Sequence, residues 1–463
     1  MAVQTFAAAT NLFKRVYFPG IRDQLNNTTP GLGILRSTGR SAWSGSEVRL
    51  ASRTGRNRSY RPTRTANESA AFPTTGRQTY DNFTVNCVIL HGSGGVTAFG
   101  SAASQGPEAA WADMLKAEIQ GHVADMRKDL EIDFYGTPLG VLGRLSADPG
   151  AGAVYTVEQD PQQLVHWRGN GNRYLSVGQL VDVVDEAGTT IHDTGLVISA
   201  VASADRTGFT CDDGGTAGNG TALAAVTTGD LVVRSGTLLD ATGAGGEANF
   251  AFSGIEHLFD SGDVATSTMP AVANAFGFEL DNIQGVDRGA TAGDYTRAPV
   301  RDFNGAALTR ASINQMVRLM WEQSGVYPDV LLCHGSIQLA IQDLMVGDQW
   351  YQPQEFPGGF KAKALVWNAG DGDIPIIPTR ECPYDRLYGL SLDCIENFVL
   401  QDFELIETDG SILRQDSGGG DVWNYNWRKF CNIGSRQPNG AFKAVRISAD
   451  EAYGAGVARH YDF

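Results

Sequence analysis

A chain of 463 residues is longer than one compact core requires, so the sequence predicts several packed units. Its net charge of −16 excludes a uniformly cationic surface and argues against a protein that binds nucleic acid non-specifically through a basic arm. No apolar run reaches the ~18 residues of a membrane span, and the amino-terminal sequence has no secretory signal. Six scattered cysteines without a CxxC pair favour reduced thiols over a zinc site or a disulfide framework. We therefore expect a cytosolic protein without a membrane partner.

Positive charge is concentrated in one stretch of this acidic chain. Nine arginines and no lysine lie between Arg36 and Arg77. Residues 1–80 hold twelve basic and three acidic side chains, a charge of +9, so the remaining residues carry −25. Because a guanidinium makes forked contacts with carboxylates that lysine cannot copy, this composition predicts a loop that docks on a specific surface. The surface is either nucleic acid or the acidic body of another copy.

Extended segments follow in this arginine-rich region. Residues 45–51 and 57–65 flank a glycine turn at Arg53–Arg56, which predicts a polar β-hairpin with too few apolar residues to fold on a core of its own. Thr79–Leu90 alternates apolar and polar side chains unevenly. It predicts a strand that leaves the loop and re-enters the body of the protein.

The strongest helix signal begins at Pro107, which suits a first-turn position, and ends before Gly136–Pro138. At ~1.5 Å per residue this helix is about 43 Å long. Its single apolar stripe requires an extended surface to lie across, because the helix projects past the edge of a compact domain. The stripe consists of Trp111, Leu115, Ile119, Val123, Met126, Leu130 and Phe134.

Residues 152–237 change in composition to Gly, Thr, Val and Asp. Short strand signals separated by turns every ~8 to 12 residues predict a small β-barrel or sandwich, inserted into the surrounding fold. Asp212–Gly215 lacks the spaced ligands and closing glutamate of a calcium loop, so we expect a surface turn there and no metal site.

Residues 262–392 predict a mixed α/β unit. Thr309 is placed to cap a helix that Gly325 ends, and the strand Val330–Cys333 leads into a second helix with Ser336 as the expected N-cap. A strand, a Gly-Ser turn and a helix can also form a nucleophile elbow. A hydrolase that uses the Cys333–Ser336 turn is therefore the enzyme alternative, although the sequence contains no GxSxG, P-loop or HExxH motif.

Strands return in residues 395–407, 421–433 and 441–447. Within the second of these, Trp423, Tyr425 and Trp427 alternate with polar residues. An aromatic face of this kind can bind sugars or bases, but at period two we favour packing into the core.

The order of these parts resembles the major capsid proteins of tailed bacteriophages, which have the Hong Kong 97-type fold. Thr79–Leu90 resembles the returning strand of that family's E-loop, Pro107–Tyr135 its spine helix, and Asp373–Pro378 its short apolar axial-domain strand. The resemblance covers nearly the whole chain and implies an α+β fold, although the simplest members lack the inserted β-domain. The implied division is an N-terminal arm (1–35), an E-loop (36–90), a peripheral domain (91–150) with the spine helix (107–135), an inserted β-domain (151–240), a return to the peripheral domain (241–261), an axial domain (262–394), and peripheral strands with the carboxyl terminus (395–463).

The resemblance implies a structural subunit without catalysis or a cofactor. Copies would assemble as pentamers and hexamers of an icosahedral virion shell in the host bacterial cytoplasm and would enclose double-stranded DNA without sequence-specific binding. It also implies a separate scaffolding protein, a portal and a decoration or cement protein as partners. A compartment shell of the same fold is the structural alternative. The arginines expected to make inter-subunit contacts are Arg49, Arg53, Arg56, Arg58, Arg61 and Arg64.

Some members of that family join subunits through an isopeptide bond from an E-loop lysine to an asparagine of a neighbour. Residues 36–77 contain no lysine, and an arginine guanidinium is too weak a nucleophile to replace one. We therefore expect the subunits of this shell to be held together non-covalently.

Overall fold

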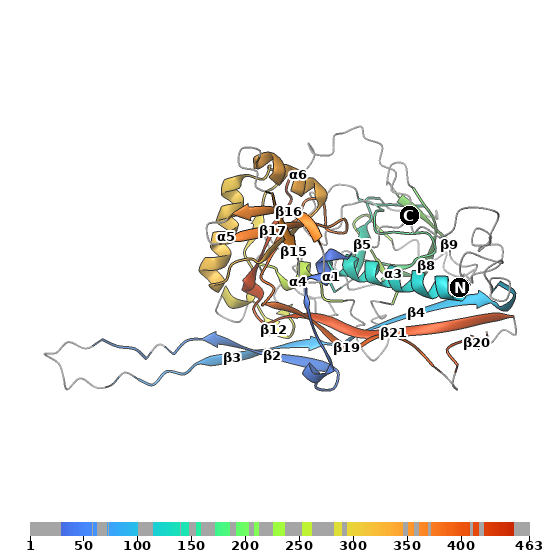
Figure 1. Cartoon of the computed structure of the whole chain (residues 1–463), viewed down its shortest axis with the longest axis horizontal. Coiled ribbons are helices and arrows are strands. Elements are labelled where there is room, and N and C mark those ends of the chain that lie inside the picture. Colours follow the sequence, from blue (N-terminus) through green and yellow to red (C-terminus); the bar gives the residue numbers. More distant parts are fainter. Residues whose placement is uncertain are drawn as a thin grey trace.

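The computed structural model describes a mixed α+β protein with a long ribbon projecting from its body (Figure 1). Within the described ranges, buried apolar side chains form three clusters, and the largest of them contains residues of more than one sheet. The expected N-terminal arm is described only from residue 29 onward. The described residues are 29–57, 59–62, 72, 74–100, 114–138, 140–147, 154–158, 172–185, 191–202, 208–212, 226–236, 252–261, 282–288, 294–345, 351–355, 361–368, 372–407, 411–415 and 421–448.

The ribbon consists of two antiparallel strands, β2 (Glu47–Gly55) and β3 (Thr79–Asn86), and it extends to the left in Figure 1. The predicted returning strand is confirmed. The predicted turn at Arg53–Arg56 is wrong, because Gly55 is still paired, opposite Thr79. The alternation of apolar and polar side chains explains this pairing of β2 with β3. Near the base of the ribbon, every second side chain is apolar and is buried in the body.

A platform of long strands supports the predicted helix (Figure 1). The central strand of this sheet pairs antiparallel with a strand on each side, and β1 adds in parallel at one edge. The helix, α3 (Met114–Phe134), contacts β4, and its stripe is buried at Met126, Leu130 and Phe134; its predicted start at Pro107 lies outside the described residues. The strands are β1 (Arg36–Thr38), β4 (Val88–Thr97), β19 (Ile395–Leu405), β20 (Arg414–Gln415) and β21 (Val422–Ser435).

Glycines in β4 make room for the aromatic side chains of β21. Gly92 lies opposite Trp427, and Gly94 lies opposite Tyr425. An added Cβ would be 2.2 Å from the Trp427 ring and 2.4 Å from the Tyr425 hydroxyl. That hydroxyl is also 2.7 Å from Nδ1 of His122 on α3, so the aromatic face joins the sheet to the helix. The prediction that these aromatic side chains pack into the core is confirmed for Tyr425 and Trp427, which are buried.

A seven-stranded sheet with α5 (Arg310–Ser324) and α6 (Gly335–Leu344) forms the second part of the body. Thr309 and Ser312 form a capping box at the start of α5, and Gly325 ends it with φ 76°, as predicted. One strand of this sheet, β22, is formed by residues that follow position 394, where the axial domain was expected to end. In spatial order the strands are β13 (Val300–Asp302), β22 (Ala441–Val445), β18 (Leu387–Leu390), β14 (Val330–Cys333), β17 (Asp373–Pro378), β16 (Lys361–Asn368) and β15 (Tyr351–Glu355).

The third part is a six-stranded antiparallel sheet whose two edge strands meet. A bridge between Leu145 and Val157 and two flanking backbone hydrogen bonds join these edges, so the sheet closes into a barrel around its own apolar cluster. The barrel begins at residue 141, ten residues before the expected boundary at 151. In order around the barrel the strands are β5 (Val141–Arg144), β10 (Leu231–Arg234), β7 (Leu180–Val184), β8 (Ile191–Val201), β9 (Gly208–Asp212) and β6 (Val154–Thr156).

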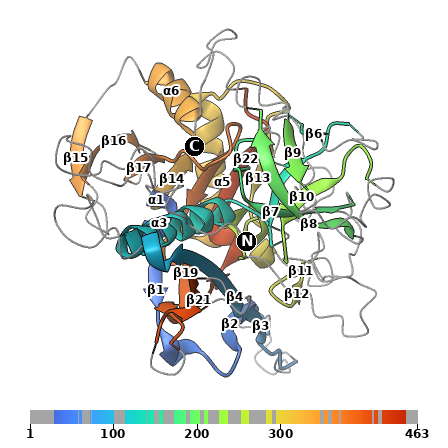
Figure 2. The same cartoon turned by 90° about the vertical axis from the view of Figure 1, so that its right-hand side faces the viewer.

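The barrel lies beside the carboxyl-terminal half of α3, and its strands are gathered on the right in Figure 2. Arg234 at the end of β10 makes ion pairs of 3.1 Å with both Asp129 and Asp133 of the helix. Ile132 of α3 belongs to the apolar cluster of the barrel. The remaining short elements are α1 (Pro30–Gly33), α4 (Ile255–Leu258), β11 (Asn282–Ile283), β12 (Val286–Asp287) and the 3-10 helices η2 (Arg40–Ala42), η5 (Asp294–Thr296) and η6 (Pro438–Gly440).

Substituting Gly92→Val should lower the free energy of unfolding by about 1–3 kcal/mol, because the new side chain would overlap the Trp427 ring. Gly121→Ala in α3 is the matched control, since nothing lies within 4 Å of its added Cβ. This control should raise the free energy of unfolding by about 0.5–1 kcal/mol. Urea denaturation of the subunit measures both changes, and a Gly92→Val protein as stable as the parent would contradict the packing described.

A fragment of residues 140–236 should fold alone, whereas a fragment of residues 152–237 should not, because the shorter one lacks β5, which pairs with β10 and closes the barrel. Circular dichroism and a thermal melt of each fragment test this. If the longer fragment is unfolded, the barrel depends on its contacts with α3.

Candidate assembly interface

The ribbon presents the expected arginines on its outward face. Arg49 and Arg53 are four residues apart in β2. Tyr80 of β3 lies opposite Arg53. All three side chains are exposed. Arg56 and Arg61 follow in described parts of the loop, whereas Arg58 and Arg64 lie outside the described residues. The structure therefore places four of the six predicted residues along one projecting element.

These arginines differ in their partners. Arg49 is already paired within the ribbon, with its Nε 2.7 Å from Oε1 of Glu47. Across the described part of the chain, no ion pair joins Arg53, Arg56 or Arg61 to a carboxylate. The ribbon therefore carries cations that no described carboxylate of the same subunit neutralises.

Aromatic side chains accompany these cations, a feature that the sequence analysis missed. The exposed fractions of Tyr60, Phe72 and Tyr80 are 88 %, 97 % and 64 %. Large exposed apolar side chains on one projecting segment are typical of a surface that binds another macromolecule, and tyrosine and arginine are enriched in protein–protein interfaces. The position of Tyr80 opposite Arg53 could only have been found from the pairing of β2 with β3.

The base of the ribbon is fixed to the body by packing and by polar contacts. Val48, Leu50, Phe83 and Val85 are buried in the cluster that includes α3 and β21. The Tyr295 hydroxyl also donates to Oδ2 of Asp81 at 2.7 Å. The ribbon therefore leaves the body in a defined direction, although its outer part contains two strands alone.

A buried carboxylate holds the described end of the N-terminal arm. Oε1 and Oε2 of Glu131 accept hydrogen bonds from the backbone N–H groups of Gly31 and Leu32, at 2.7 and 2.9 Å. A Cβ at Gly31 would lie 2.6 Å from Oε1, so only glycine allows this approach. Burial raises the pKa of Glu131 to about 7, against the lowering effect of the two backbone hydrogen bonds.

The Cys333–Ser336 turn is a structural feature that joins the central strand of the seven-stranded sheet to α6. The exposed fraction of Ser336 is 1 %, and its hydroxyl donates to the carbonyl oxygen of Tyr384 at 3.2 Å. Burial raises the pKa of the Cys333 thiol, which disfavours the nucleophilic thiolate. The prediction of Ser336 as N-cap is wrong: His334 caps α6, because its Nδ1 accepts from the backbone N–H of Ser336.

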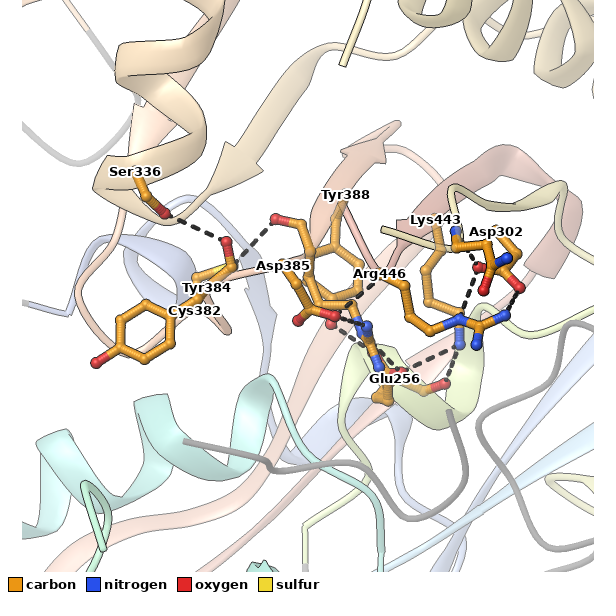
Figure 3. A network of polar contacts seen from close by, with 11 residues as sticks. Glu256, Asp302, Ser336, Cys382, Tyr384, Asp385, Tyr388, Lys443 and Arg446 are labelled. Carbon is orange, nitrogen blue, oxygen red and sulfur yellow. Dashed lines mark hydrogen bonds and ion pairs between the residues drawn. The ribbon is translucent and has the colours of Figure 1, made fainter. Parts of the chain in front are cut away.

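A network of buried charges lies between α4 and the seven-stranded sheet (Figure 3). Arg386 is fully buried, pairs with Asp385 and lies 3.6 Å from Oε1 of Glu256, while the Tyr388 hydroxyl donates to the other oxygen of Glu256. Burial raises the pKa of Asp385 to about 6, although the charge of Arg386 acts in the opposite direction. No sequence pattern predicted this network, since Glu256 is more than a hundred residues from Asp385, Arg386 and Tyr388.

Within the described ranges, no group of three or more His, Cys, Asp or Glu side chains is placed to hold a metal ion. A search of the same residues finds no helix that is long and apolar enough to cross a membrane.

Substituting Glu131→Gln should remove part of the pH dependence of stability. The folded-state pKa of Glu131 is raised from 4.5 to about 7, so its contribution is fully present below about 4.5 and is lost as the pH rises to about 7. Urea denaturation at pH 5 and pH 7.5 should show a smaller difference for the variant than for the parent. An unchanged difference would show that this carboxyl group does not titrate as its burial requires.

Comparisons with known proteins show which family and which solved structures this chain is similar to. Residues 236–409 match the family model described as SU10 major capsid protein. No curated protein sequence matches the chain.

Among solved structures, the chain is similar to a subunit of the cyanophage A-1(L) capsid asymmetric unit, with 11 % identity, 96 % and 100 % of the two chains covered and a TM-score of 0.49. It is similar to the capsid of the native GTA particle, with 9 % identity, 96 % and 100 % covered and a TM-score of 0.45. It is also similar to the holo-SrpI encapsulin of Synechococcus elongatus PCC 7942, with 8 % identity, full coverage of both chains and a TM-score of 0.43.

Over residues 236–409 the chain is therefore similar to SU10 major capsid proteins. The described parts also include the projecting ribbon and the long helix that the sequence resemblance implied.

Proposed function

We propose that this chain is a major capsid protein of the tailed-phage type with a Hong Kong 97-type fold, and that the β2–β3 ribbon joins its copies into an icosahedral virion shell by docking on an acidic surface of a neighbouring subunit. The observation that supports this most strongly is the outward face of the ribbon, where Arg53, Arg56 and Arg61 have no ion pair within the described residues. An element with these charges and exposed aromatic side chains gains contacts only from another molecule.

The acceptor is the body of another copy, because the chain outside residues 1–80 carries a net charge of −25. One exposed ion pair contributes only about 0.2–1 kcal/mol. Several pairs repeated at every contact of a closed symmetric assembly add to a large term. Because residues 36–77 contain no lysine, the ribbon joins its neighbour non-covalently.

The proposal extends to the partners that a tailed-phage shell requires. Pentamers and hexamers assemble in the host bacterial cytoplasm with a separate scaffolding protein and a portal, and a decoration or cement protein is a further partner. The shell encloses double-stranded DNA without reading its sequence, and the subunit performs no catalysis. The burial of Ser336 and Cys333 supports this last point, because neither side chain is accessible to a substrate.

Replacing Arg53, Arg56 and Arg61 together by glutamate should leave a folded subunit that no longer closes shells, because the outward face of the ribbon would then repel the acidic acceptor. Circular dichroism checks the fold, and sedimentation with electron microscopy measures assembly. The control replaces the same three residues by lysine, which keeps the charge but loses the forked geometry. This control should assemble at low salt and fail near physiological ionic strength, where the screening length is ~8 Å. Normal shells from the glutamate variant would contradict the proposal, and shells that fail only to retain DNA would place the ribbon against the genome.

A further inference from the structure

Lys443 and Glu256 lie close together inside the network of buried charges (Figure 3), and Asp260 completes a compact group with them. Nζ of Lys443 is 2.8 Å from Oδ2 of Asp260 and 3.4 Å from Oε1 of Glu256. It also donates to the backbone carbonyl oxygen of Glu256 at 3.1 Å. The side chains of Lys443 and Asp260 have no exposed surface, and that of Glu256 is 3 % exposed. An amine, a carboxyl carbon and a second carboxylate are therefore held in contact away from water.

We propose that Lys443 and Asp260 condense to form an isopeptide bond within the subunit, with Glu256 as the catalytic proton carrier. The site is separate from the assembly ribbon and does not depend on it. The bond would join β22 of the seven-stranded sheet to the residue two positions after α4. It would fasten together two segments that are 183 residues apart in the sequence.

The reaction balances without an oxidant or a co-reactant. A proton passes from the Lys443 ammonium group to the Asp260 carboxylate, which leaves a neutral amine and a carboxylic acid. The Nζ lone pair then forms a bond to Cγ of Asp260, and Glu256 takes a proton from the nitrogen and returns it to the departing hydroxyl group. The Cγ–O bond breaks and one water molecule leaves. The products are a neutral amide and an unchanged Glu256 carboxylate.

Burial favours this reaction in two ways. Each isolated charge that is removed from water carries a large desolvation cost, and condensation eliminates one cation and one anion. Reacting groups held in contact also have an effective concentration far above that of free groups in solution. The amide N–H that remains keeps its acceptor, since the Glu256 carbonyl oxygen already accepts from Nζ.

A second lysine–aspartate pair in the same chain provides a matched comparison. Nζ of Lys429 lies 2.9 Å from Oδ1 of Asp402, nearly the same distance as in the buried pair. The Asp402 side chain, however, is 80 % exposed. Water solvates the Asp402 carboxylate, so condensation would relieve little desolvation cost and we expect no bond there.

Mass spectrometry of the purified full-length subunit tests the proposal. After denaturation and trypsin digestion, the parent protein should yield residues 235–288 joined to residues 437–446, with a mass lower by one water than the sum of the two peptides. Cleavage after Lys443 should be blocked. Intact particles should still release single chains on a denaturing gel, because the bond lies within one subunit. Recovery of free residues 437–443 from the folded parent, without the joined peptide, would overturn the proposal.

Variants assign the bond to its residues. Lys443→Met and Asp260→Ala should abolish the joined peptide, and Glu256→Gln should slow its appearance by about 100-fold or more, the usual loss for a proton-transfer group. Lys429→Met should leave it unchanged. Circular dichroism of each variant verifies folding, and the parent digest remains decisive if a variant fails to fold. A joined peptide that persists in Asp260→Ala would rule out Asp260 as the partner.

Discussion

In the proposed assembly, the rest of the structure depends on one constraint: the arginines of a two-stranded ribbon must be neutralised by a neighbouring subunit. Two strands alone bury too little apolar surface to be stable in water, and the outer part of this ribbon has no described third strand or helix against it. Of the arginines on the described part of this projecting element, only Arg49 has a carboxylate partner within the described residues. An acidic surface of a neighbouring subunit can neutralise the other arginines. The stability of the ribbon and the assembly of the shell would then depend on the same contacts.

The body of the subunit directs this ribbon. Its base shares one apolar cluster with α3 and the platform strands, and the described end of the arm is held against the same helix by Glu131. The aromatic side chains of β21, seated over Gly92 and Gly94, connect the platform to α3. The barrel and the seven-stranded sheet enclose their own clusters. The cluster at the base of the ribbon also contains Val330, Leu332 and Tyr388 of the seven-stranded sheet, so the platform is packed against the rest of the body.

Local signals predicted much of this fold. The N-cap at Thr309 and the αL glycine at Gly325 each depend on near neighbours in sequence, and each is found in the structure. The strand Asp373–Pro378, which the family resemblance implied, is also found. The partner of β2 was predicted wrongly because glycine turn chemistry at Gly55 indicated a close hairpin, whereas the register places Thr79 opposite it. The N-cap of α6 was displaced by two residues because an imidazole accepts the backbone hydrogen bond as well as a serine hydroxyl does.

The functional surface was predictable only in part. Arginine clustering identified the ribbon, but a sequence pattern does not show that Glu47 already neutralises Arg49 or that Tyr80 lies beside Arg53. Buried contacts such as Glu131 with Gly31, or Lys443 with Asp260, join residues about a hundred or more positions apart, and their meaning depends on burial. Such contacts can be identified only from the folded structure.

Hydrogen exchange of the backbone amides, compared between unassembled subunits and assembled particles, tests the central claim most directly. If the ribbon docks on a neighbouring subunit, amides of Ala51–Gly55 and Thr79–Asn82 should exchange slowly in particles and rapidly in free subunits, while amides of the barrel strands change little. Equal and rapid exchange of these ribbon amides in both states would contradict the account.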